Sequence, residues 1–143
     1  MYIIAWTGDV PVGHVGLVLP DDREVVDTVE SRGSPILHDL EVVPAHRRRG
    51  IGRALARTVE SEARARGSAL LGLRTGIDDG YAAARALYRS LGWVEEPDSL
   101  CLESARIPTD EGSYRVYIEV VTMWWKELQP ERGSSSSPSC SRP

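Results

Sequence analysis

Residues 40–56 run Leu-Glu-Val-Val-Pro-Ala-His-Arg-Arg-Arg-Gly-Ile-Gly-Arg-Ala-Leu-Ala. The segment opens with β-branched residues, turns at Pro44, passes three arginines and two glycines, and continues into a sequence typical of a helix. Gly50 and Gly52 can take backbone angles closed to other residues and let a ligand approach the main chain. The first turn of a helix has unpaired N–H groups and a positive dipole end, which favour an anion. The segment therefore predicts a phosphate-binding loop between a strand and a helix.

Three arginines, Arg47, Arg48 and Arg49, would add positive charge beside a bound phosphate. A plainer interpretation is a strand-to-helix turn with a solvated basic face. Two familiar phosphate loops are excluded, because the pattern Gly-x-x-x-x-Gly-Lys-[Ser/Thr] is absent and no third glycine stands at dinucleotide-binding spacing. What remains is the spacing Arg47-x-x-Gly50-x-Gly52.

The composition of the whole chain limits the function classes. With 143 residues, 41% hydrophobic and 27% charged, the chain suits one globular domain. A net charge of −4 argues against a general nucleic-acid binder. No apolar run approaches the roughly 20 residues of a membrane span, and no basic signal-peptide region opens the chain. Because only Cys101 and Cys140 are present, we expect no disulfide framework and a cytoplasmic location.

Hydrophobic periodicity and turn residues predict the elements around the loop. Strands are expected at 2–6, 12–19, 36–43, 69–75, 93–95 and 114–124. Helices are expected at 51–66 and 81–91, closed by Gly67 and Gly92. The remaining segments are a hairpin turn at 7–9, a polar turn at 20–23, a strand extension or loop at 24–30, loops at 76–80 and 96–112, and a disordered Ser/Pro-rich tail at 129–143. A strand, helix and strand of this length implies a right-handed crossover, with 36–43 parallel to 69–75.

The loop spacing resembles the acetyl-coenzyme A (acetyl-CoA) loop of the GCN5-related N-acetyltransferase (GNAT) superfamily, whose pattern is [Arg/Gln]-x-x-Gly-x-[Gly/Ala]. That family typically has Leu-x-Val-x-Pro before the loop, matched here by Leu40, Val42 and Pro44. Residues 86–93, Ala-Leu-Tyr-Arg-Ser-Leu-Gly-Trp, resemble its second signature, [Ala]-x-x-Leu-Tyr-x-x-x-Gly-[Phe/Trp]. The resemblance covers about residues 2–128. We therefore expect residues 1–128 to form one domain. The resemblance implies an α/β (α+β) fold with a central mixed, mostly antiparallel sheet, a splayed parallel pair and flanking helices.

One departure from the family concerns the start of the chain. Family members usually begin with a strand and two helices, which form one wall of the acceptor site, whereas this chain begins almost at the following hairpin. We therefore expect a shortened version, a wall supplied by another subunit, as in a homodimer, or a true start upstream of Met1. The acceptor is the property that this departure affects most.

The resemblance also assigns a co-substrate, acetyl-CoA, and its contacts. Backbone groups of 40–42 would hold the pantetheine arm, and N–H groups of 48–53 would hold the pyrophosphate. The expected cofactor-binding residues are Leu40, Glu41, Val42, Arg47, Arg48, Arg49, Gly50, Ile51, Gly52, Arg53, Tyr81 and Tyr88. No metal-ligand spacing is present, so no metal is expected.

Tyr88 matches the signature tyrosine and is the candidate general acid, since its phenol could donate a proton to the departing thiolate. The alternative is an aromatic residue that packs a helix on the sheet. His38 is the candidate base, because histidine titrates in the useful range and a family member has a histidine on this strand implicated as a base through water. Alternation would place His38, Leu40 and Val42 on one face and Glu41, a weaker catalytic candidate, on the other. The competing interpretation of His38 is an ordinary core or surface histidine.

The predicted function is acetyl transfer from acetyl-CoA to a primary amine by direct attack. The amine could belong to a small molecule, a protein N-terminus or a lysine, with no nucleic-acid or membrane partner. Asp78 and Asp79 could contact that amine or lie in a solvated turn. The competing class is a non-catalytic acyl-CoA-binding or regulatory module of the same fold. A nucleotide-binding protein is a third interpretation, which no Mg²⁺-binding or base-recognition pattern supports.

Overall fold

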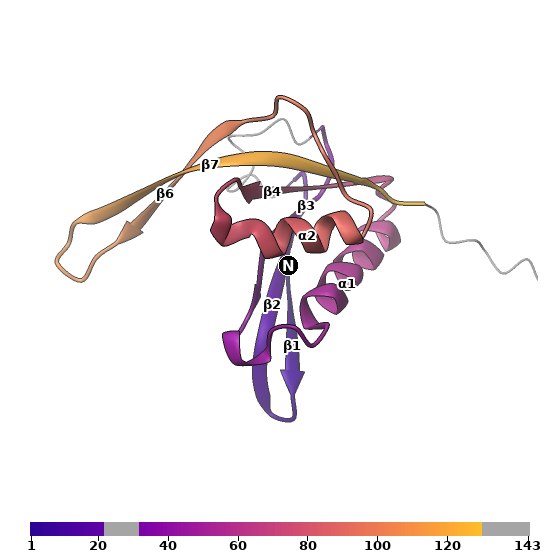
Figure 1. The fold of residues 1–143 in the computed structure, drawn as a ribbon, viewed down its shortest axis with the longest axis horizontal. Helices are drawn as coiled ribbons and strands as arrows, with labels where there is room; N and C mark the ends of the chain where they lie inside the picture. Colours follow the sequence, from indigo (N-terminus) through magenta and orange to yellow (C-terminus); the bar gives the residue numbers. More distant parts are fainter. Residues whose placement is uncertain (22–31, 130–143) are drawn as a thin grey trace, which may run out of the picture.

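The computed structural model describes residues 1–21 and 32–129. Its elements are β1 (Tyr2–Thr7), β2 (Val10–Val18), β3 (Ile36–Val42), η1 (Pro44–His46), α1 (Ile51–Ala65), β4 (Leu70–Gly76), η2 (Asp79–Tyr81), α2 (Ala82–Ser90), β5 (Val94–Glu95), β6 (Cys101–Pro108) and β7 (Tyr114–Glu127) (Figure 1). Residues 20 and 21 lie in a turn, as predicted for 20–23. The described residues do not include 22–23, the segment 24–30 or the tail from residue 130 onward.

The strands form one mixed sheet in the order β1-β2-β3-β4-β7-β5, with β6 paired to β7. In the described part of the chain, β3 and β4 pair in parallel, and the other paired strands run antiparallel. The sheet therefore confirms the predicted fold class, including the parallel pair joined by a helix.

The parallel pair is short. Strands β3 and β4 pair only through Ile36 with Gly72 and Leu37 with Leu73. A Cβ atom at Gly72 would lie 2.7 Å from Ile36 and 2.8 Å from Trp125, so glycine permits close packing there. Beyond Leu37, the edge of β3 that faces β4 pairs with no strand among the described residues. The strands are thus splayed at their C-terminal ends, which is where a site can form.

Both helices pack into one core. Helix α1 contributes Leu55, Val59 and Ala63, spaced four apart and almost wholly buried. Helix α2 contributes Tyr88, whose ring lies 6.5 Å from that of Trp124 on β7. A fully buried leucine or valine contributes about 1.5–3 kcal/mol to stability. The core therefore fixes both helices against the sheet.

The ends of α1 explain its length. Gly50 precedes the helix with φ 83°, a left-handed conformation that favours glycine. At the other end Gly67 has φ 81°, its N–H donates to the Arg64 carbonyl at 2.9 Å, and Ser68 N–H donates to the Ala63 carbonyl at 3.0 Å. The predicted C-terminal cap is confirmed.

A buried ion pair links α1 to β7. Glu60, 6% exposed, accepts hydrogen bonds from Lys126 Nζ at 2.8 Å and Trp93 Nε1 at 3.1 Å. Lys126 Nζ also donates to the Leu91 carbonyl at 2.7 Å, directly after α2. These contacts join both helices to the strand beside β4.

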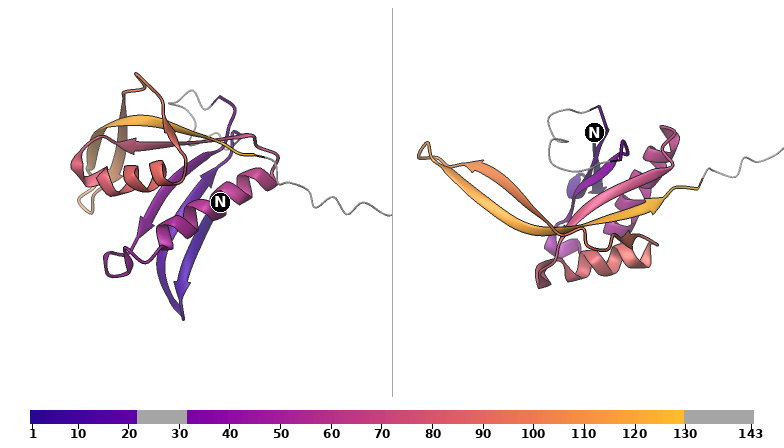
Figure 2. Two further views of the ribbon diagram at one scale, coloured as in Figure 1. Left: turned by 45° about the vertical axis from the view of Figure 1, so that its right-hand side comes forward. Right: turned by 90° about the horizontal axis from the view of Figure 1, so that it is seen from above.

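The segment 96–112, predicted as a loop, contains strand β6. It pairs with β7 along its whole length, and the β6–β7 hairpin extends away from the helices (Figures 1 and 2). Large apolar side chains on both strands are exposed, among them Leu102 at 72% and Ile118 at 69%. Because this part of the hairpin buries neither face, its sequence lacks the burial pattern from which strands are predicted.

Candidate active site

Two adjoining cavities lie where β3 and β4 separate. The smaller, about 500 Å³, lies beside the loop before α1, and the larger, about 670 Å³, lies between β3, β4 and β7. Four residues line both: Leu40, Glu41, Tyr81 and Ala84. A ligand in one cavity can therefore meet a ligand in the other at these residues.

The smaller cavity ends at the N-terminus of α1. Ala54 N–H donates to the Gly50 carbonyl at 3.0 Å, so the N–H groups of Ile51, Gly52 and Arg53 precede the first intrahelical donor. A Cβ atom at Gly52 would lie 3.5 Å from Leu87, an ordinary contact, so packing alone does not require glycine there. The free donors and the open space beside them fit the pyrophosphate of an acyl-CoA.

The arginines of this loop have different roles. Arg47 Nε donates to the Val42 carbonyl at 2.9 Å, which holds the loop against the end of β3. Arg48 has φ 62°, an uncommon left-handed conformation for a side-chain-bearing residue. Arg53 donates to Ser90 Oγ at 2.8 Å and so joins the start of α1 to the end of α2. Arg49 is not among the residues that line either cavity.

The structure brings most of the expected cofactor-binding residues to one place. Those that line the smaller cavity are Leu40, Glu41, Val42, Arg47, Arg48, Gly50, Ile51, Gly52, Arg53 and Tyr81. Tyr88 lines the larger cavity instead. Their contacts with a cofactor stay a prediction.

Tyr88 is both a core residue and a cavity residue. It is 5% exposed, and its ring packs against Trp93 and Trp124 with centroids 5.9 and 6.5 Å apart. Burial raises the pKa of Tyr88 to about 12. The phenol therefore stays protonated at neutral pH and can donate a hydrogen bond to a developing negative charge. The packing interpretation and the catalytic one are compatible.

Strand β3 contains a bulge at Asp39, which has φ 48°. The pairing with β2 shifts between the pair Glu41–His14 and the pair His38–Gly16. His14 and Gly16 lie two residues apart on β2 and so face the same side, and their partners Glu41 and His38 face that side too. The bulge therefore brings His38 and Glu41 to one face of the sheet.

The predicted arrangement of these side chains is wrong for this reason. His38 was expected to share a face with Leu40 and Val42, with Glu41 opposite. Leu40 and Val42 instead pack against the core, which includes Leu37, the residue before His38. The extra residue of the bulge breaks the two-residue alternation that the sequence argument assumed. His38 and Glu41 nevertheless both line the larger cavity.

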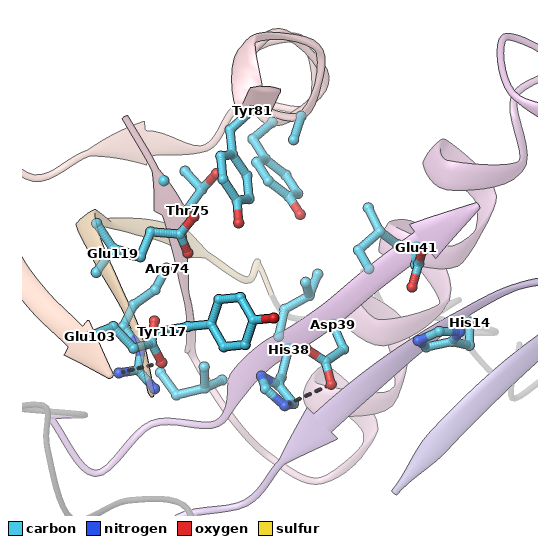
Figure 3. Close-up of a pocket in the computed structure, with 17 residues that line it drawn as sticks. His14, His38, Asp39, Glu41, Arg74, Thr75, Tyr81, Glu103, Tyr117 and Glu119 are labelled. Carbon is cyan, nitrogen blue, oxygen red and sulfur yellow. Dashed lines mark ion pairs between the residues drawn. The ribbon is translucent and has the colours of Figure 1, made fainter. Parts of the chain in front are cut away.

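The surroundings of His38 include an acidic partner. Its Nε2 lies 2.9 Å from Asp39 Oδ2, and Tyr2 donates its hydroxyl hydrogen to the same oxygen at 3.2 Å. The His38 side chain is 37% exposed, so solvent reaches it. Figure 3 shows His38 and Asp39 on one wall of the cavity, with Tyr117 extending toward them from β7.

Tyr81 stands at the junction of the two cavities. Its ring lies over Gly76, where a Cβ atom would come within 2.4 Å of it, so glycine is required at 76. A hydrogen bond to Glu119, together with burial, raises the pKa of Tyr81 to about 12. Glu119 lies on β7, so its hydrogen bond with Tyr81 connects the junction of the two cavities to that strand.

The predicted loop residues Asp78 and Asp79 line neither cavity. Asp78 Oδ1 accepts the Gly80 N–H at 2.7 Å and so caps the turn η2. Arg85 Nη1 donates to the carbonyls of Gly76 and Asp78 at 2.7 and 2.8 Å. These bonds hold the loop in place, which is a structural role.

Several polar residues of the larger cavity were not predicted. They come from β4, β6 and β7: Arg74, Thr75, Glu103, Tyr117 and Glu119. Arg74 forms an ion pair with Glu103 at 3.1 Å. The sequence held no local signal for this wall, since it depends on β7 pairing with both β4 and β6 and continuing past the C-terminal end of β4.

Comparisons with known proteins agree with this architecture. A family model described as the acetyltransferase (GNAT) family matches residues 1–93. The chain belongs to this family. No curated protein matches the chain significantly.

Solved structures show the same fold. The ribosomal-protein-S18-alanine N-acetyltransferase from Escherichia coli is 23% identical, with TM-score 0.60 over 94% of this chain and 72% of its own. The yncA structure from Salmonella typhimurium, which holds its cofactor acetyl-CoA, is 19% identical, with TM-score 0.59 over 94% and 68%. A Bacillus subtilis acetyltransferase in complex with CoA is 15% identical, with TM-score 0.62 over 90% and 76%.

None of the described helices has the length and apolar character of a membrane span. In the residues that the structure describes, no group of three or more histidine, cysteine, aspartate or glutamate side chains is placed to hold a metal ion.

Proposed function

We propose that this protein is an N-acetyltransferase that transfers the acetyl group of acetyl-CoA to a primary amine. The observation that carries the proposal is the junction of the two cavities. One cavity ends at the free N–H groups of α1, and the other contains Tyr88, His38 and Glu41. Membership of the acetyltransferase (GNAT) family and the relatives solved with acetyl-CoA or CoA support this assignment.

Acetyl-CoA binding would use backbone groups more than side chains. The N–H groups of Ile51, Gly52 and Arg53 would bind the pyrophosphate at the positive end of α1. The unpaired edge of β3, residues 40–42, would bind the pantetheine arm, as another strand would. The thioester would then lie at the junction, beside Leu40 and Tyr81.

Acetyl transfer would proceed by direct attack. The amine nitrogen bonds to the thioester carbonyl carbon, the carbon–sulfur bond breaks, and the amine loses a proton. Tyr88 would hydrogen-bond to the departing sulfur and supply its proton. His38 or Glu41, which share one face of β3, would accept the amine's proton directly or through water. No cysteine lines either cavity in the described part of the chain, so a covalent acyl-enzyme has no evident nucleophile there.

The competing function is a non-catalytic acyl-CoA-binding module. We favour catalysis because the larger cavity holds ionisable groups where an acceptor would lie, which binding alone would not need. The test combines titration calorimetry with acetyl-CoA and release of free thiol in the presence of monoamines, diamines and peptides. Catalysis predicts binding and amine-dependent thiol release. Binding without thiol release for every amine would identify the non-catalytic module.

A further inference from the structure

The larger cavity has an excess of negative charge. Its carboxylates are Asp39, Glu41, Glu103 and Glu119, against the single guanidinium of Arg74. Glu103 is paired with Arg74, and Asp39 lies beside His38. Glu119 forms no ion pair with any residue that the structure describes. Its charge is therefore available to a ligand.

Glu119 is held in position rather than neutralised. Its carboxylate accepts the hydroxyl of Tyr81, whose pKa is raised to about 12, so Tyr81 remains an uncharged donor. Glu119 is partly buried, and charges there are screened less than on an open surface. Glu119 is thus held by Tyr81 and pairs with no cationic side chain of the described residues.

Thr75 lines the same cavity but faces the other side of the sheet. It pairs with Thr122, whereas Gly76 pairs with Val121, two residues from Glu119. Because side chains alternate along a strand, Thr75 and Glu119 point to opposite faces. The Thr75 hydroxyl, buried without a hydrogen-bond partner among the described residues, therefore does not share a ligand group with Glu119.

Glu119 lies apart from the place where acetyl transfer would occur. The two cavities meet at Leu40, Glu41, Tyr81 and Ala84, whereas Glu119 lines only the larger one. An acceptor with its reactive amine at the junction would have the rest of its structure near Glu119. A cavity of about 670 Å³ is of the size that holds a small molecule.

We infer that the acceptor is a small polycationic amine: one amine is acetylated, and a second, protonated amine is bound by Glu119. This inference rests on the proposed function and adds the class of substrate to it. A carboxylate-bearing acceptor would be repelled by the same cavity.

The test measures binding of matched amines to the CoA-saturated protein by calorimetry. The probes are 1,4-diaminobutane, 4-amino-1-butanol and 4-aminobutanoate, which differ only at the end remote from one amine. A charge-assisted hydrogen bond predicts that the diamine binds about 10- to 100-fold more tightly than the amino alcohol. Glu119→Gln should abolish this preference, and Glu111→Gln, at the exposed hairpin tip, should keep it. The preference should also shrink as salt is raised.

The inference would be overturned by equal affinity for the diamine and the amino alcohol, or by a preference that survives in Glu119→Gln. These outcomes are distinct from failure of the proposed function. If the proposed function failed, no amine would release thiol from acetyl-CoA, but the binding preference of the cavity could still be measured.

Discussion

At the scale of single residues, Tyr88 combines burial with a position in the larger cavity. Tyr88→Phe keeps the ring that packs on Trp124 and removes only the hydroxyl. We expect kcat to fall by about 10²–10⁴-fold, the typical contribution of general acid catalysis, with the affinity for acetyl-CoA unchanged. Steady-state kinetics and calorimetry measure the two effects. An unchanged kcat in the folded variant would leave Tyr88 with a packing role alone.

The raised pKa of Tyr88 gives this prediction a pH dependence. The phenol must be protonated to donate, so the donor is lost only as the pH rises through its pKa of about 12. An unperturbed tyrosine, with a pKa of about 10, would instead begin to lose the donor at a correspondingly lower pH. We therefore expect no fall in kcat between pH 8 and roughly pH 10 that is caused by this group. A fall in the wild type that is absent in Tyr88→Phe would contradict the burial argument.

His38 and Glu41 share one face of β3, so either could accept the proton of the amine. If His38 does so, kcat/KM should fall in His38→Gln, which keeps similar size but removes the basic nitrogen, and should change little in Glu41→Gln. Steady-state kinetics with a reactive amine measures both variants. Equal kcat/KM for the wild type and His38→Gln would transfer the role to Glu41 or to an amine bound already deprotonated.

At the scale of elements, the loop before α1 acts through its main chain. A Cβ atom at Gly52 meets only ordinary contacts, so Gly52→Ala should fold and bind acetyl-CoA nearly as the wild type does. Gly52→Val places a larger group at the helix N-terminus and should weaken acetyl-CoA binding by at least about tenfold. Gly50 is a poorer test position, because its φ of 83° would strain any substitution. Calorimetry would reject the assignment of this loop if Gly52→Val bound acetyl-CoA normally.

The ion pair of Glu60 and Lys126 fixes α1 against β7. Lys126→Met keeps the apolar stem but leaves the buried carboxylate with Trp93 as its remaining partner. We expect the free energy of unfolding to fall by about 1–3 kcal/mol. The exposed pair of Glu62 and Arg66 is the control, since Arg66→Met should cost less than about 1 kcal/mol. Urea unfolding measures both, and equal losses would show that burial of the pair is unimportant.

Elements with a strong local pattern were predictable from the sequence. The loop with Gly50 and Gly52, helix α1 and its cap at Gly67 each depend on residues close together in the chain. The bulge at Asp39 was not predictable, because an aspartate in a strand sequence does not by itself indicate a left-handed backbone conformation. Strand β6 was missed because it is held by pairing with β7 rather than by burial.

At the scale of the whole molecule, the site depends on where distant elements meet. Glu119 lines the larger cavity because β7 runs beside β4 and continues past its C-terminal end. Such a wall has no signature in a single sequence, whereas the loop before α1 has a pattern that a family shares. The sequence therefore predicted the fold and the loop before α1, but not the wall that β6 and β7 form.

The claim central to this account is that both cavities serve one reaction, acetyl transfer to an amine. Its most direct test is mass spectrometry of the products after incubation with isotopically labelled acetyl-CoA and 1,4-diaminobutane. The account predicts labelled N-acetylated diamine in an amount equal to the CoA released, with both products strongly reduced in Tyr88→Phe. Tight binding of acetyl-CoA without any labelled amide, for this diamine or the other amines of the panel, would contradict it.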